Sequence, residues 1–295
     1  FPLPAFYFDA SDEDNWLVVD GLQRLSALEN FVLKKTLKLN ALEVLKELNG
    51  LKYDDLPHKM KLRIDEFQVM AYLIKPGTPK EVKYDIFNRI NTGGLTLTSQ
   101  EIRHALNQKI AAPFFKNLVY NPDEATPEYS EKYARYINVN DKRMAGRELI
   151  LRYLAFKRIG WQNYKPTLQR FLDMEMERLE QGVDNETLQM IEQLWKALEV
   201  AHVLFGEHVF SKTLANPSGR RLLNSSLFEV WTVMLSEINE TQQQRLIENK
   251  ESLVEEFKEY LKTPDFQRAI TSSTTSRQNV GIRFHWIEHL ITKNL

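Results

Sequence analysis

The chain has 295 residues, of which 43% are hydrophobic and 27% are charged, and its formal net charge at pH 7 is −1. This composition is typical of a globular protein with enough apolar material for a core, in one large domain or two modest ones. Because there is no overall positive surplus, any contact with nucleic acid or an anionic membrane needs a local patch. The absence of cysteine excludes disulfides, thiolate catalysis and Cys-ligated zinc.

The sequence carries no secretory signal at its start and no apolar run of about 18 residues that could span a bilayer. We therefore expect a cytoplasmic protein. The first residues, Phe1-Pro2-Leu3-Pro4, lead without an initiator Met directly into an apolar run at 5–8. This opening is typical of the middle of a domain, and we expect a segment upstream to be missing from this sequence.

The first third of the chain mixes strand and helix patterns. The runs 5–8, 16–19 and 67–74 are rich in aromatic and β-branched residues, which favours strands. Apolar residues recur at helical spacing from Gln23 onward, and again over 42–48 and 80–90. A capping box at Thr98–Glu101 predicts a further helix to about residue 108.

Beyond that helix the strand patterns vanish. Helices are predicted over 141–158, 166–181, 186–205, 221–237 and 249–261. The sequence therefore predicts an α+β protein, with a small mixed domain over 1–108 followed by a larger all-helical domain over 109–295.

The turn Asp20-Gly21-Leu22-Gln23-Arg24 joins a predicted strand to a predicted helix. Free amides at a helix start and the helix dipole favour an anion there. Gly21 allows close approach of the backbone, and the Arg24 guanidinium suits bidentate contact with a phosphate. Gln23 can donate to a phosphate oxygen or hold a water. Asp20 can orient Arg24, hold a magnesium-bound water or position an attacking water.

A purely structural interpretation of the same turn stays open. Asp20 then only caps the helix, Gly21 only supplies the turn, and Arg24 is solvated.

A second polar turn, Asn91-Thr92-Gly93-Gly94, lies between two predicted helices, with Arg89 just before it. Its amides are candidates for an anion-binding nest that approaches the first turn, and a plain helix–helix connector is the alternative.

Three segments resemble a known family. The run VVDGLQRLSAL at 18–28 resembles the signature (I/V)-D-G-Q-Q-R-L-x-x-L of the family that includes the N-terminal domain of GmrSD type IV restriction enzymes. The run FNRINTGG at 87–94, followed by Gln100, Glu101 and Arg103, is similar to the second signature of that family. Residues 141–152 resemble a third block.

The resemblance implies a ParB/sulfiredoxin-like first domain whose Gly-x-x-Arg turn binds nucleotide phosphates. In defence-linked members the motif is tied to hydrolysis of nucleoside triphosphates, so the resemblance implies functional roles for Asp20, Gly21, Gln23 and Arg24. This chain departs from the signature at Leu22, where the family usually has Gln. Turnover is weakened if that Gln positions water or phosphate, and unaffected if its side chain packs inward.

Other motifs carry less information. His285-Trp286-Ile287-Glu288-His289 matches H-x-x-E-H, but exposed histidines explain it better than zinc. The basic residues of the helix predicted over 141–158 form either a solvated face or a surface for DNA or phosphate. The His-rich core of an HNH nuclease, which larger relatives carry, is not found in this sequence, so we do not expect this chain alone to cleave DNA.

These observations lead to three hypotheses. The first is a magnesium-dependent nucleoside triphosphatase that regulates a defence or restriction-type system. In that case Arg24, Gln23 and Asp20 act on phosphate and water, and the backbone at Gly21 and 93–94 completes the phosphate site. The second is a non-hydrolysing sensor of nucleotide or DNA that acts with a partner nuclease. The third is a DNA-binding protein, which the near-zero net charge disfavours.

Overall fold

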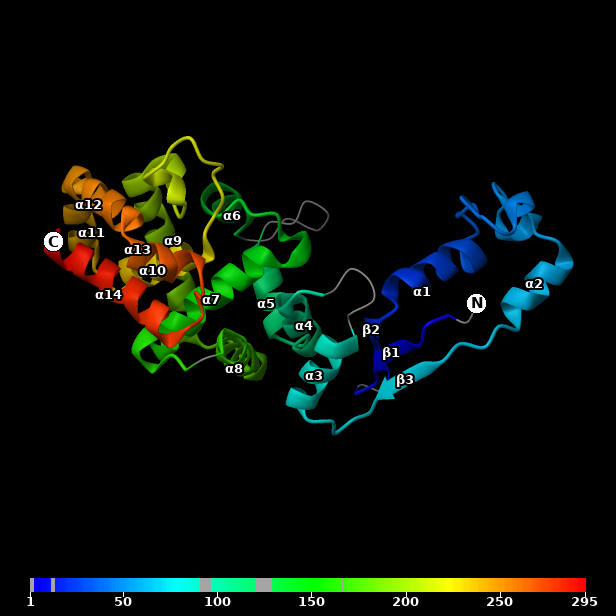
Figure 1. Ribbon diagram of the computed structural model, residues 1–295. Coiled ribbons are helices and arrows are strands. Elements are labelled where there is room, and N and C mark those ends of the chain that lie inside the picture. The colour runs from blue at the N-terminus through cyan, green and yellow to red at the C-terminus, as the bar shows by residue number, and fades with distance from the viewer. Residues whose placement is uncertain (1–2, 12–13, 91–96, 120–128, 166) are drawn as a thin grey trace. The chain divides into compact units, whose positions relative to one another are not determined.

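The computed structural model describes residues 3–11, 14–90, 97–119, 129–165 and 167–295 (Figure 1). The chain forms two compact units, residues 1–97 and residues 98–295. The first contains a small mixed sheet with short helices, and the described part of the second is helical. The predicted α+β class is therefore confirmed.

The sheet of the first unit has three strands, β1 (Phe6–Asp9), β2 (Leu17–Asp20) and β3 (Ala71–Ile74). Strand β1 lies in the centre, antiparallel to β2 and parallel to β3. Its register with β2 shifts between Tyr7 and Phe8, at the end where β2 leads into the next helix. The turn after β2 therefore lies beside the start of β1.

The helices of the first unit are short, and the first of them widens into a π-helical turn over Glu29–Leu33. They are α1 (Leu22–Leu28), α2 (His58–Asp65) and α3 (Lys80–Ile90). Lys83 on α3 donates to both carboxylate oxygens of the buried Asp9, at 2.9 and 3.2 Å, and to the hydroxyl of Ser11. This ion pair fixes α3 to the end of β1 opposite the turn after β2.

Two predicted elements differ in the structure. The helix predicted over 42–48 is only a 3-10 turn at Lys46–Leu48. Leu39 exchanges backbone hydrogen bonds with Gly50 and Leu51, and the Asn49 side chain bonds the amide and carbonyl of Leu42. These bonds compete with helical ones. The strand predicted over 67–74 is a strand only at 71–74, because β1 offers only four partner residues.

The second unit is a helical bundle, and its Thr98–Glu101 capping box is formed as predicted. Its α-helices are α4 (Ser99–Leu106), α5 (Ala111–Leu118), α6 (Ser130–Tyr136), α7 (Ala145–Ile159), α8 (Leu168–Gln181), α9 (Asn185–Phe205), α10 (Ser225–Ser236), α11 (Glu240–Glu248), α12 (Lys250–Lys262), α13 (Pro264–Thr271) and α14 (Arg277–Lys293).

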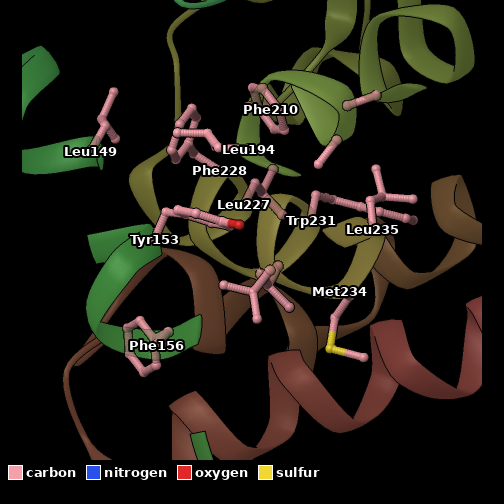
Figure 2. Close-up of a cluster of buried hydrophobic side chains, with 14 of the residues drawn as sticks. Leu149, Tyr153, Phe156, Leu194, Phe210, Leu227, Phe228, Trp231, Met234 and Leu235 are labelled. Carbon is pink, nitrogen blue, oxygen red and sulfur yellow. The ribbon is translucent and has the colours of Figure 1, made fainter. Parts of the chain in front are cut away.

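Helix α10 lies at the centre of this bundle. Residues 226–236 are buried on every side, as expected for a helix surrounded by others. Trp231 packs edge-on against Phe205 of α9 and Phe257 of α12, with ring centroids 4.7 and 5.0 Å apart. Figure 2 shows Leu227, Phe228 and Trp231 among side chains from α7 and α9. The core of this unit is therefore built around α10.

The same central helix carries a buried carboxylate. Glu229 is fully buried and pairs with Arg283 of α14 and, at 3.1 Å, with Arg152 of α7. Arg283 also donates to the carbonyls of Ala269 and Thr274, before and within the α13–α14 connection. One carboxylate therefore holds α7, α10 and α14 together.

None of the helices in the described residues is both long and apolar enough to cross a membrane.

We predict that Glu229→Gln lowers the free energy of unfolding by about 3 kcal/mol or more, because it leaves buried guanidinium groups without their carboxylate. Urea denaturation of both proteins measures this change. The matched control is Glu259→Gln, which removes the carboxylate of an exposed pair with Lys262 and should change stability by less than about 0.5 kcal/mol. Equal losses for the two variants would contradict the structural role of Glu229.

Candidate functional site

The turn after β2 changes direction within one residue. Gly21 adopts a left-handed conformation, with φ 101° and ψ 6°, directly before α1. The first helical hydrogen bond runs from the amide of Leu25 to the carbonyl of Gly21, at 2.9 Å. The amides of residues 22–24 precede that bond, so the helix itself offers them no acceptor. The first amides of α1 therefore have no acceptor within the helix.

Only glycine fits at position 21. It is buried, and a Cβ atom there would overlap with Cδ1 of the Phe6 ring and lie 3.3 Å from Nη2 of Arg24. The left-handed conformation adds a cost for any residue with a side chain. The turn thus lies directly against the first residue of β1.

The Arg24 guanidinium is held from three sides. Its Nη2 donates to Asp20 Oδ2 at 2.6 Å and to the carbonyl of Ala5 at 3.3 Å, and its Nη1 donates to the carbonyl of Pro4. Its Cζ lies 4.7 Å from the centroid of the Phe6 ring, a cation–π contact. The Arg24 and Asp20 side chains are 27% and 33% exposed. Asp20 therefore orients Arg24, one of the roles considered from the sequence.

These contacts leave part of the guanidinium available. Arginine has five N–H donors, and the three acceptors above use three of them. Oδ1 of Asp20 accepts no hydrogen bond within the described residues. Two N–H donors of Arg24 therefore have no hydrogen-bond partner in the described residues.

Gln23 and Leu22 both lie on the outer surface of the first turn of α1. Leu22 is 62% exposed, so the possibility that the side chain at this position packs inward is wrong for this chain. Gln23 is also exposed and has no hydrogen-bond partner within the described residues. A side chain that can bind water or phosphate is therefore present at position 23 but not at position 22.

The second predicted turn, Asn91–Gly94, lies outside the described residues. Arg89, just before it, is an exposed residue in the last turn of α3. Its approach to the first turn stays a prediction. Glu101 of the second signature pairs with Arg143 at 2.9 Å in the second unit.

Arg103, the arginine of the second signature, makes contacts that hold two helices of the second unit together. Arg103 is buried and its Nε donates to Asp173 of α8 at 2.8 Å, while its other nitrogens contact Gln100 and Gln169. Burial raises the pKa of Asp173, and the nearby Arg103 charge opposes that shift. These contacts fix α4 to α8.

The basic residues at and just before the start of α7 differ in exposure: Lys142 and Arg143 are exposed, whereas Arg147 and Arg152 are mostly buried. Arg147 is buried and pairs with Asp141 at 2.7 Å. Burial raises the pKa of Asp141, and Arg147 opposes that shift. Arg152 is mostly buried between Glu148 and Glu229. Arg147 and Arg152 are therefore not available to a DNA phosphate, and the DNA-surface alternative stays a prediction for the exposed Lys142 and Arg143.

The H-x-x-E-H sequence lies on α14, where His285 is largely exposed and His289 is exposed. In the described part of the chain, no three His, Asp or Glu side chains converge as a metal site would require.

The sequence patterns did not predict that Phe6 and the carbonyls of Pro4 and Ala5 contact Arg24. The aromatic run at the chain start was the only signal for them.

Comparison with known proteins gives one match. Residues 1–108 match the family described as the N-terminal domain of the GmrSD restriction endonuclease. This segment belongs to that family. A role related to a restriction system follows for the GmrSD N-terminal domain of this chain. Searches of curated proteins and of solved structures found no match.

The GmrSD N-terminal match covers the whole first unit and continues through α4, which belongs to the second compact unit. It therefore includes both glycine-containing turns. The remaining helices, from α5 onward, lie beyond the matched segment.

We predict that Gly21→Ala destabilises the first unit more than Gly50→Ala does. Both glycines have φ between 84° and 101°, so each substitution carries a conformational cost of about 1–2 kcal/mol. Only position 21 adds an overlap with the Phe6 ring, worth about 1–3 kcal/mol, because no atom lies within 4 Å of a Cβ at Gly50. Thermal unfolding measures both changes, and indistinguishable midpoints would contradict the close contact between Gly21 and Phe6.

Proposed function

We propose that the first unit binds a nucleoside triphosphate with magnesium at the Asp20–Arg24 turn, and that it hydrolyses the nucleotide as a regulatory component of a restriction-type system. The observation that carries this proposal is the buried Gly21 turn. It brings the start of α1 and an oriented Arg24–Asp20 pair to one point, in a domain of the GmrSD N-terminal family.

Each residue of the proposed site has a specific role in binding or hydrolysis. The amides at the start of α1 and the remaining donors of Arg24 bind phosphate oxygens. Gln23 orients a phosphate or the attacking water. Gly93 and Gly94, with Arg89, Asn91 and Thr92, complete the phosphate site in this proposal.

Magnesium fits the donor set at Asp20. One oxygen of this carboxylate accepts from Arg24, and the other has no partner within the described residues. Magnesium is commonly bound through one or two carboxylates together with substrate phosphates. When bound, the ion neutralises the charge that develops on the phosphates.

A second candidate is a sensor that binds nucleotide or DNA without turnover and acts with a partner nuclease. The exposed Leu22 favours it, because a leucine at this surface position cannot bind a water or a phosphate. For a nucleotide ligand, the two candidates share one binding site and differ only in whether the phosphoanhydride bond is broken.

We predict that the wild-type chain binds ATP or GTP in the presence of magnesium, and that Arg24→Ala weakens binding by about tenfold or more. Charged hydrogen bonds to phosphate contribute about 1.5–3 kcal/mol, which sets this scale. Isothermal titration calorimetry with each nucleotide and a non-hydrolysable analogue measures the change. Arg63→Ala is the matched control, since it removes the same charge from an exposed position on α2.

Phosphate release, followed in the same samples, separates the enzyme from the sensor. Release that Arg24→Ala abolishes supports hydrolysis at this turn, and binding without release supports the sensor. Absence of nucleotide binding by the wild-type chain would refute the enzyme and the nucleotide sensor, and would leave only a sensor of DNA. Equal weakening by Arg63→Ala would mean that overall charge, not the turn, determines affinity.

A further inference from the structure

The segment that leads into β3 exposes an unusual amount of apolar surface. Every residue from 65 to 73 is exposed. Among them are five large hydrophobic side chains that are between 41% and 60% exposed: Phe67, Val69, Met70, Tyr72 and Leu73. No charged residue occurs between Phe67 and Ile74. Contiguous apolar surface of this kind is typical of a protein interface.

The backbone of the same segment forms an open sheet edge. Strand β3 pairs with β1 on one side and is the last strand of the sheet (Figure 1). The carbonyls of Met70 and Ile74 accept from the amides of Phe6 and Ala10, at 2.8 and 2.9 Å. In a parallel pair the intervening residues direct their backbone groups the other way. Ala71 and Leu73 therefore present their amides and carbonyls at the open edge.

These outward backbone groups have no hydrogen-bond partner within the described residues. Natural proteins protect such edges with charged side chains, proline or a covering element, because an unpaired edge recruits another strand. Here Lys75 and Pro76 follow the strand, and the eight residues before Lys75 are uncharged. The edge is therefore suited to a further strand.

The charges at the two ends of the segment specify which strand fits. Asp65 and Glu66 precede the apolar run and Lys75 follows it, and all three are exposed. Asp65 accepts from the hydroxyl of Tyr53 at 2.6 Å, whereas the side chains of Glu66 and Lys75 have no partner in the described residues. When two copies of this segment run antiparallel, the acidic end of each meets the basic end of the other. A parallel arrangement would place like charges together.

We propose that a second copy of this chain pairs antiparallel with the open edge of β3, forming a two-fold symmetric dimer with a continuous six-stranded sheet. Residues with outward backbone groups pair with one another across the interface. With the two-fold axis at Met70, Phe67 lies opposite Leu73 of the second copy, and Val69 lies opposite Ala71. Such an interface uses the same surface on both subunits, as a two-fold dimer requires. This proposal does not depend on nucleotide binding.

Sedimentation equilibrium of the full chain, over a range of concentrations, tests the proposal. We expect the wild type to approach twice the monomer mass, and Leu73→Lys to raise the dimer dissociation constant by about tenfold or more. Val44→Lys is the matched control, since it adds the same charge at an exposed valine outside this edge and should leave the dimer intact. A wild type that stays monomeric at all concentrations, or equal effects of the two variants, would overturn the proposal.

Two further variants separate pairing of the edge from a loss of folding. Lys75→Glu should weaken the dimer, and adding Asp65→Lys should restore it. Positions 65 and 75 lie opposite each other when the two-fold axis is at Met70, so this exchange recreates opposite charges across the antiparallel interface. Ala71→Pro should also weaken the dimer, since it removes an outward amide that β1 does not use. Circular dichroism of each variant checks that a weaker dimer does not come from a loss of folding. A failure of the double variant to regain dimer would overturn the antiparallel arrangement.

Hydrogen exchange of the β3 backbone amides distinguishes a second copy of the chain from another segment that covers the open edge of β3. In the proposed dimer, the amides of Ala71 and Leu73 are protected at high protein concentration and exchange faster on dilution below the dissociation constant. Protection that is independent of concentration would mean that another segment of the same chain covers the edge, which would refute the dimer.

Discussion

The close approach of Gly21 to the Phe6 ring is the contact on which the geometry of the candidate site depends. Because no Cβ intervenes, the turn after β2 lies directly on the first residue of β1. The same ring lies under the Arg24 guanidinium, and Arg24 in turn binds the carbonyls of Pro4 and Ala5. A side chain at position 21 would displace the ring and, with it, the support of the guanidinium.

Arg24 has both a structural and a chemical role in this arrangement. Its contacts with Asp20 and with two backbone carbonyls fix the guanidinium before any ligand arrives. Preorganised donors lose little conformational entropy on binding, which favours an anion at the remaining N–H groups. The purely structural interpretation has Asp20 capping the helix and Arg24 solvated, whereas Asp20 makes no capping hydrogen bond within the described residues and accepts one from Arg24 instead.

The sequence predicted the local features of the site, and tertiary pairing determined the rest. A β-branched run ending in Asp20-Gly21 predicted the strand, the turn and the helix that follows, because these depend on neighbouring residues. The contacts of Arg24 with Pro4 and Ala5 join residues 19 and 20 positions apart and depend on the shifted register between β1 and β2. Periodicity carries no information about that register. The helix predicted over 42–48 failed for a related reason, since Asn49 and the pairing of Leu39 override its apolar spacing.

Membership of the GmrSD N-terminal family does not make every signature residue part of a binding site. Arg103 is buried against Asp173 and therefore stabilises the packing of α4 on α8, whereas the Arg24 side chain is partly exposed.

Phe6 contacts both the β3 segment and the candidate site in the first unit. Its backbone amide pairs with Met70 before β3, and its ring supports Arg24. A shift of β1 along β3 would move both together, so pairing at the open edge of β3 and the geometry of the Asp20–Arg24 turn are physically linked through one residue.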